Sequence, residues 1–151
     1  MRRKDREITD HAEIEGIIRE ATVCRIGFAD GGEPYVVPLS FGYEDGSVYI
    51  HSAREGKKIE MLAKNPRCCF EVDICDRLVK GDKPCSWGMR YRSVIGYGRA
   101  ATLTEPEEKK HGLNCIMQHY GGGTHDFSDG DLDSVTVIRI MLDSLTGKKH
   151  A

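Results

Sequence analysis

The sequence predicts a small, mainly β protein, an antiparallel barrel of six strands with a few helices at its periphery. Three observations support this fold class: extended segments alternate apolar and polar residues, glycine-containing turns separate them, and only three segments have the spacing of a helix. The chain has 151 residues, the length of one domain. Without an internal repeat or a linker, we expect a single domain over residues 1–151.

The first strand is expected at residues 22–29, where Cys24, Ile26 and Phe28 lie on one face. The turn sequence Asp30-Gly31-Gly32 follows and indicates a hairpin with the next strand. Further strands are expected at residues 34–43, 47–53, 67–73, 87–103 and 135–143. In the long segment 87–103, glycines suggest bends that curve the sheet.

Helical spacing and start signals predict three helices. The first covers about 11–21, with Asp10 as its N-cap, and the second covers 56–64. The third covers 104–120 and has a proline in its first turn. Residues 121–134 are expected to form a glycine-rich acidic loop, and residues 144–151 to form a tail.

Charge and hydropathy exclude several classes of protein. The formal net charge is -2, whereas a nucleic-acid-binding protein needs a basic excess. The charged N-terminus is not a signal peptide, and no apolar stretch approaches the roughly 18 residues of a membrane-spanning helix. We therefore expect a cytoplasmic protein with reduced cysteines. No Cys-x-x-Cys pair occurs, and the histidine spacing predicts no metal site.

One segment has the features of a phosphate site. Residues 51–58 leave a strand, turn and enter a helix that begins with Lys57 and Lys58. Lysines at a helix N-terminus gain nothing from the helix dipole, whereas an anion there would gain from free N–H groups and from both ammonium groups. The alternative is a pair of solvated surface lysines.

Two further cationic clusters occur. In the segment 87–93, Arg90 and Arg92 should share one strand face, with aromatic residues and Ser93 on the other. Such a surface would suit an aromatic ligand with an anionic tail, although an ordinary strand with exposed arginines is equally simple. The second cluster, Lys148 and Lys149, taken alone is typical of a frayed, solvated tail.

His51 lies on a strand face opposite Val48 and Ile50. Its ordinary pKa is close to neutral pH, so it could donate a proton in a reaction. A strand histidine can equally be a hydrogen-bonded structural residue, and the sequence leaves both interpretations open.

Several motifs, in this order, carry a family resemblance. They are the segments 34–43, 49–53, 56–58, 65–67, 91–100 and 140–150. Together they resemble the pyridoxamine phosphate oxidase-like superfamily of flavin-binding split barrels and, within it, the 5-nitroimidazole-resistance (Nim) proteins. The similarity covers nearly the whole chain.

The resemblance implies a six-stranded split barrel that forms a homodimer with two FMN sites at the interface. Val37, Pro38, Leu39 and Ser40 would line the flavin ring through backbone and side-chain contacts. The other implied FMN-binding residues are His51 and Ser52 beside the ring, Lys57 and Lys58 on the phosphate, Arg92 and Ser93 from the partner subunit, and Lys148 and Lys149 approaching the phosphate.

The resulting hypothesis is a flavin-dependent reductase that passes electrons from reduced FMN to a small acceptor such as a nitroimidazole, with His51 as proton donor. The alternative is a non-catalytic protein that binds or senses flavin or haem. Oxidation of pyridoxamine phosphate is disfavoured, because the sequence offers no second basic cluster for a substrate phosphate. The physiological substrate and the electron donor stay open.

Overall fold

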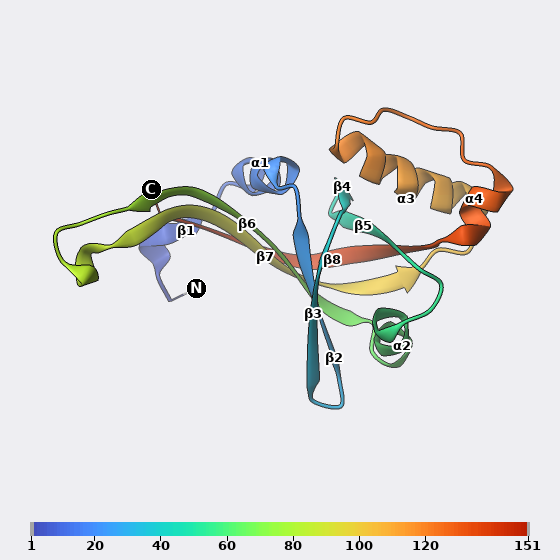
Figure 1. Cartoon of the computed structure of the whole chain (residues 1–151), viewed down its shortest axis with the longest axis horizontal. Coiled ribbons are helices and arrows are strands. Elements are labelled where there is room, and N and C mark those ends of the chain that lie inside the picture. Colours follow the sequence, from blue (N-terminus) through green and yellow to red (C-terminus); the bar gives the residue numbers. More distant parts are fainter. Residues whose placement is uncertain (1, 151) are drawn as a thin grey trace.

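The computed structural model describes residues 2–150, which form one eight-stranded antiparallel sheet with helices around it (Figure 1). Its strands are β1 (Glu7–Ile8), β2 (Cys24–Asp30), β3 (Glu33–Leu39), β4 (Gly42–Glu44), β5 (Ser47–Ser52), β6 (Arg67–Val79), β7 (Gly88–Thr102) and β8 (Thr136–His150). The strand order is β3-β2-β6-β7-β8-β5-β4, and β1 pairs with β8. The mainly β, antiparallel class is confirmed. The expected number of six strands is wrong, because β1 and β4 are too short to show alternation.

The two edges of the sheet meet at one point. β3 and β4 lie at opposite ends of the strand order, yet only Ser40 and Phe41 separate them in the chain. Two residues span only about 10 Å, so the sheet has to curl until its edges approach. Phe41 is fully buried there, and its N–H donates to the Tyr120 hydroxyl at 3.1 Å. The single strand expected at 34–43 is therefore divided in two.

The helices are α1 (His11–Glu20), α2 (Lys57–Lys64), α3 (Pro106–His119) and α4 (Asp129–Ser134), with short 3-10 turns at Lys4–Arg6 and Pro84–Ser86. The three expected helices are confirmed. Asp10 caps α1 as predicted, since its carboxylate accepts from the Ala12 N–H at 3.0 Å. The fourth helix is a correction to the expected 121–134 loop. Ser128 and Asp131 cap its start reciprocally, a signal present in the sequence.

The sheet has an inner and an outer face. Ile26, Phe70 and Ile140 point inward with the apolar sides of α1 and α2, and these three side chains are fully buried. α3 instead covers part of the outer face, where Tyr49 packs in a second cluster with Cys115. The main core therefore fills the barrel, and a smaller one fixes α3 outside it.

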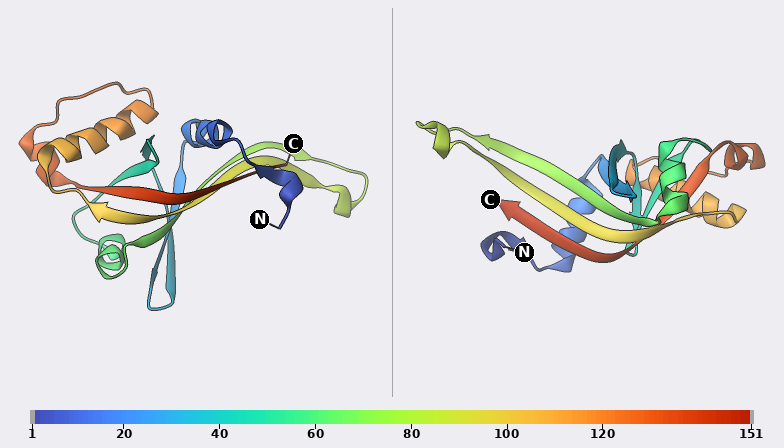
Figure 2. Two further views of the ribbon diagram at one scale, coloured as in Figure 1. Left: turned by 180° about the vertical axis from the view of Figure 1, so that it is seen from behind. Right: turned by 90° about the horizontal axis from the view of Figure 1, so that it is seen from below.

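The hairpin of β6 and β7 extends beyond the core as a two-stranded arm, joined at its tip by the turn at Pro84–Ser86 (Figure 2). The expected end of β6 at residue 73 is wrong, because the strand continues to Val79. A bulge between Cys75 and Arg77 interrupts the alternation, and most side chains of the arm are exposed on either face. The apolar periodicity that predicts a half-buried strand is consequently lost.

Residues 144–150 do not form the expected tail, and residue 151 lies outside the described residues. β8 continues to His150 and pairs with β7 from Ile138 to His150, and β1 adds pairs from Glu7 and Ile8. Lys148 and Lys149 are thus fixed in a paired strand. Main-chain hydrogen bonds order this segment although its side chains are largely polar.

Candidate functional site

The N-terminus of α2 is open to an anion. Its N-cap, Gly56, has a φ of +127° and no side chain, so the first N–H groups of the helix have no side-chain cap. Glycine is suited to this backbone conformation, which L side chains rarely adopt. Unpaired N–H groups at a helix start attract negative charge.

The two lysines of the first turn lie in different surroundings. Lys57 is exposed, and its Nζ lies 3.5 Å from Glu33 Oε1 and 4.9 Å from the centre of the Tyr35 ring. Lys58 is half-buried and has no ion-pair partner within residues 2–150. Burial lowers the pKa of Lys58 from its ordinary value of 10.5. An ammonium group held partly out of water without a counter-ion is what a bound phosphate would complement.

The contacts of Lys57 place the start of α2 against β3, the strand expected to line the flavin ring. Val37 and Leu39 direct their side chains toward the core, whereas Pro38 is exposed, as is Ser40 beyond the strand. β3 pairs with β2 alone, so its other edge carries free backbone groups. A flat ligand beside Val37 and Leu39 would therefore meet their backbone rather than their side chains.

His51 and Ser52 end β5, five residues before α2 begins. The His51 ring makes no hydrogen bond to any other residue of the described chain, so the structural interpretation lacks the bond it requires. The ring borders an apolar cavity of about 260 Å³ whose lining includes Leu113, Met117 and Phe127. Sequence reasoning missed these lining residues. Phe127 carried the one signal, as the large apolar residue in an otherwise acidic, glycine-rich segment.

The four remaining predicted residues lie at the other end of the molecule. Ser93 pairs with Lys148 across β7 and β8, and Arg92 pairs with Lys149. These strand ends lie beside β1 and the C-terminus, whereas α2 lies at the far end of the sheet (Figures 1 and 2). Within one chain, the two halves of the predicted site are therefore apart.

Because side chains alternate along β7 and β8, these four residues lie on two different faces of the sheet. Arg92 and Lys149 point to the inner side, where Lys149 Nζ lies 2.7 Å from Glu13 Oε1 of α1. Arg92 lies 2.7 Å from both Glu20 Oε2 and Asp76 Oδ1, and hydrogen bonds to these carboxylates raise its pKa. Both side chains thus already have anionic partners. Ser93 and Lys148 point to the outer face, so a ligand there would meet this pair.

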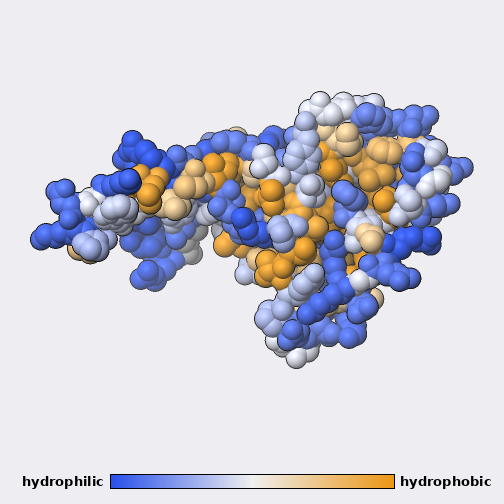
Figure 3. All heavy atoms as spheres, in the orientation of Figure 1, coloured by the Kyte–Doolittle hydropathy of each residue, from blue (hydrophilic) through white to orange (hydrophobic). Residues whose placement is uncertain are grey.

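The outer face carries several exposed apolar side chains. Cross-strand register and alternation place on it six of the nine large hydrophobic side chains that are more than 40% exposed: Val36, Leu78, Met89, Ile95, Tyr97 and Met141. In the view of Figure 3, apolar surface occurs both on the body of the molecule and on the arm. The outer face also carries charged side chains, among them the ion pair of Arg25 and Asp73. A surface with many exposed apolar side chains is a candidate interaction face.

Known proteins share this architecture and much of the sequence. The family model described as pyridoxamine 5'-phosphate oxidase matches residues 10–149. The chain belongs to this family. Within it, a candidate 5-nitroimidazole antibiotic resistance protein from Bacteroides thetaiotaomicron is 40% identical, with a TM-score of 0.85 over 95% of this chain and 86% of that one. The expected resemblance is therefore confirmed.

Two other solved structures extend the comparison. An FAD-binding protein from Mesorhizobium loti is 25% identical, with a TM-score of 0.72 and coverage of 97% and 98% of the two chains. A flavocytochrome from Azotobacter vinelandii is 20% identical, with a TM-score of 0.87 and coverage of 100% and 72%, and so shares the fold. Members of the pyridoxamine 5'-phosphate oxidase family bind flavins. Among curated protein sequences, none matches this chain significantly.

No helix within residues 2–150 has both the length and the apolar character needed to cross a bilayer.

Proposed function

We propose that this protein is a homodimeric FMN-binding reductase of small acceptors, with nitroimidazoles and other nitroaromatics as the substrate class. The observation that carries the proposal is the half-buried, unpaired Lys58 at the uncapped start of α2, where Lys57 contacts Glu33 and Tyr35 of the edge strand β3. This arrangement suits a ligand that combines a phosphate with a flat ring. FMN is such a ligand.

The separation of the predicted site residues supports a dimer. The helix α2, which carries Lys58, and the end of β8, which carries Lys148, lie at opposite ends of the sheet, so a single FMN can contact both lysines only if a second copy supplies one of them. The apolar outer face, which carries Ile95 and Tyr97 next to Ser93, offers a surface for that second copy. Two-fold symmetry would complete two equivalent sites.

In this proposal the chain holds and orients the flavin, and His51 handles a proton. FMN, when bound, supplies the electron transfer. Reduction of a nitro group to a nitroso group takes two electrons and two protons and releases one water. The His51 ring, which has no hydrogen-bond partner in the described chain, would donate one of these protons to an acceptor that sits in the apolar cavity beside it.

The primary experiment is the absorption spectrum of the purified protein, followed by its mass from light scattering. We expect a flavin spectrum and a dimer. Tyr97→Asp should yield monomers with much weaker FMN binding, because a charge on the apolar face would have to be buried. A monomer with full FMN occupancy would overturn the shared site.

Catalysis needs its own measurement. Dithionite-reduced protein should be reoxidised by a nitroaromatic compound under anaerobic conditions in a single turnover, faster than free reduced FMN is. If the protein reacts no faster than the free cofactor, a reductase role is excluded. The second candidate, a haem-binding protein, is favoured by the free His51 ring beside apolar side chains. A haem spectrum that is lost in His51→Ala would establish it.

A further inference from the structure

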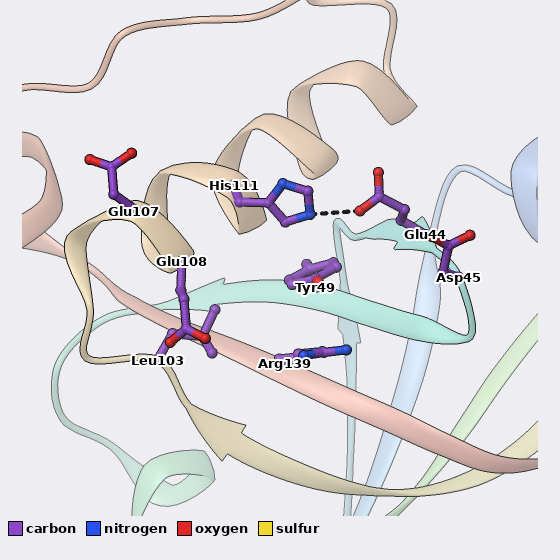
Figure 4. Close-up of a pocket in the computed structure, with 8 residues that line it drawn as sticks. All are labelled: Glu44, Asp45, Tyr49, Leu103, Glu107, Glu108, His111 and Arg139. Carbon is purple, nitrogen blue, oxygen red and sulfur yellow. Dashed lines mark hydrogen bonds and ion pairs between the residues drawn. The ribbon is translucent and has the colours of Figure 1, made fainter.

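A second concave site lies on the outer face, away from α2. It is a cavity of about 450 Å³ bounded by α3, β5, β8 and the turn between β4 and β5 (Figure 4). Its floor is formed by Tyr49 from β5 and Arg139 from β8, which are direct cross-strand neighbours. His111 and Glu108 reach it from α3, and Leu103 provides an apolar wall.

The Tyr49 hydroxyl reaches the cavity from an otherwise buried side chain. The residue is only 5% exposed, it borders the cavity, and its hydroxyl has no hydrogen-bond partner within residues 2–150. The hydroxyl is accessible at the cavity wall, so a ligand in the cavity can accept its hydrogen bond. Burial raises the pKa of Tyr49, which keeps the hydroxyl protonated and able to donate.

Arg139 adds a fixed cation beside this hydroxyl. Its Nε donates to the buried Ser47 hydroxyl at 3.0 Å, and this bond holds the side chain in place. Within the described residues, no carboxylate lies within 4 Å of its guanidinium group. The two terminal nitrogens and the Tyr49 hydroxyl therefore offer donors to the same cavity, a set suited to a carboxylate.

Carboxylates also line the cavity, and they indicate what the rest of the ligand carries. Glu44 is occupied by His111, whose Nε2 lies 2.6 Å from its Oε2. Glu107 lies at the outer rim of the cavity and pairs with Lys110 at 3.4 Å (Figure 4). Glu108 lines the cavity on the side of Leu103, and Asp45 lines it on the side of the turn between β4 and β5; neither has an ion-pair partner in the described chain (Figure 4). A ligand with its aliphatic part on Leu103 would place a positive group near Glu108.

We infer that this cavity binds a small aliphatic α-amino acid, with its carboxylate on Arg139 and Tyr49 and its ammonium group facing Glu108. Leu103 and the Tyr49 ring would contact the aliphatic side chain. The inference is independent of the proposed function, because it involves neither His51 nor the residues of α2 and β3 that are proposed to bind FMN.

Calorimetric titration of the full chain with three probes tests the assignment. The probes are L-leucine, 4-methylpentanoate, which lacks the ammonium group, and 3-methylbutylamine, which lacks the carboxylate. We expect leucine to bind most tightly and the amine not to bind. Arg139→Gln should weaken leucine at least about tenfold, and Tyr49→Phe about fivefold. Arg90→Gln, an exposed arginine on the arm, is the matched control and should bind as the wild type does.

Glu108→Gln provides the decisive comparison. It should lower the preference for leucine over 4-methylpentanoate, about fivefold in the wild type, to near one. If 4-methylpentanoate binds as well as leucine to the wild type, the cavity is an anion site and the amino-acid assignment is overturned. Absence of binding by leucine, alanine and glycine at millimolar concentration overturns it too. Tyr49→Phe keeps the test valid if Arg139→Gln does not fold, because it removes a hydroxyl that makes no bond in the described chain.

Discussion

The unequal surroundings of Lys57 and Lys58 predict that the two residues contribute unequally to FMN binding. Lys58 is half-buried without a counter-ion, so a phosphate would form a charge-assisted hydrogen bond in a partly desolvated position. Such a bond is worth roughly 1.5–3 kcal/mol, so Lys58→Ala should weaken FMN binding about 10-fold to 150-fold.

Lys57 should contribute much less. Its side chain is 51% exposed, and it would have to give up its contact with Glu33 to reach a phosphate. Exposed ion pairs are worth roughly 0.2–1 kcal/mol, so Lys57→Ala should weaken FMN binding less than about sixfold. The order of the two effects follows from burial and existing partners, not from their position in the sequence.

Fluorescence titration with FMN and with riboflavin, which lacks the phosphate, measures these effects. Riboflavin affinity should be nearly the same in wild type, Lys57→Ala and Lys58→Ala. Equal losses for both flavins would mean that neither lysine faces the phosphate, and a larger effect from Lys57 would refute the burial argument.

The pH dependence provides an independent check. FMN affinity relative to riboflavin should rise through pH ~6, where the phosphate gains its second charge. It should fall again at alkaline pH as Lys58 loses its proton, and this fall should begin at lower pH than an exposed lysine would give, because burial lowers the Lys58 pKa. Lys58→Ala should lack the alkaline fall.

Three further predictions follow from the packing and from the site. Gly112→Ala should lower the free energy of unfolding, measured by urea denaturation, by about 1–2 kcal/mol, because the new Cβ would lie 2.9 Å from two buried side chains. Gly16→Ala has open space around its new Cβ and should raise the free energy of unfolding by about 0.5–1 kcal/mol. Equal effects of the two substitutions would contradict this packing. Burial and a hydrogen bond to Glu15 raise the pKa of Tyr43 to about 12. The Tyr43 hydroxyl therefore contributes fully to stability below pH ~10, and this contribution is lost as the pH rises toward 12. Tyr43→Phe should lack this part of the alkaline loss of stability, and identical pH profiles of stability for the variant and the wild type would argue against the prediction. His51→Ala and His51→Gln should both retain FMN binding but slow the single-turnover reoxidation of the reduced protein by a nitroaromatic compound about 10²–10⁴-fold. Recovered activity in the glutamine variant would indicate that His51 positions the acceptor and does not transfer a proton.

Local signals in the sequence were sufficient for the parts of the fold that depend on neighbours along the chain. The Asp10 cap and the proline at position 106 both lie at helix starts, as predicted. The arm and the end of β8 could not be found in this way, because their strands are held by main-chain pairing between distant segments. Such pairing leaves no apolar periodicity when both faces are exposed.

The candidate site was likewise predictable only where residues close in the sequence define it. The lysines at the start of α2 were visible from their position after Gly56. The ion pairs of Arg92 and Lys149 were not, because Glu20 and Glu13 lie 72 and 136 residues away from them in the sequence. The cavity above Tyr49 and Arg139 was missed for the same reason, since its walls come from four separate segments.

The central place of β8 has a consequence for how the chain folds. This strand lies between β7 and β5 and also pairs with β1, yet it consists of residues 136–150, which are synthesised after all the strands it joins. Until these residues leave the ribosome, β7 and β5 have unpaired edges, and their apolar faces are exposed to aggregation. Pairing of Glu7 with Lys148 also closes a loop of nearly the whole chain, a feature of slow-folding proteins. The barrel is therefore expected to close only after residues 136–150 have been synthesised, and until then the nascent chain depends on protection of these edges.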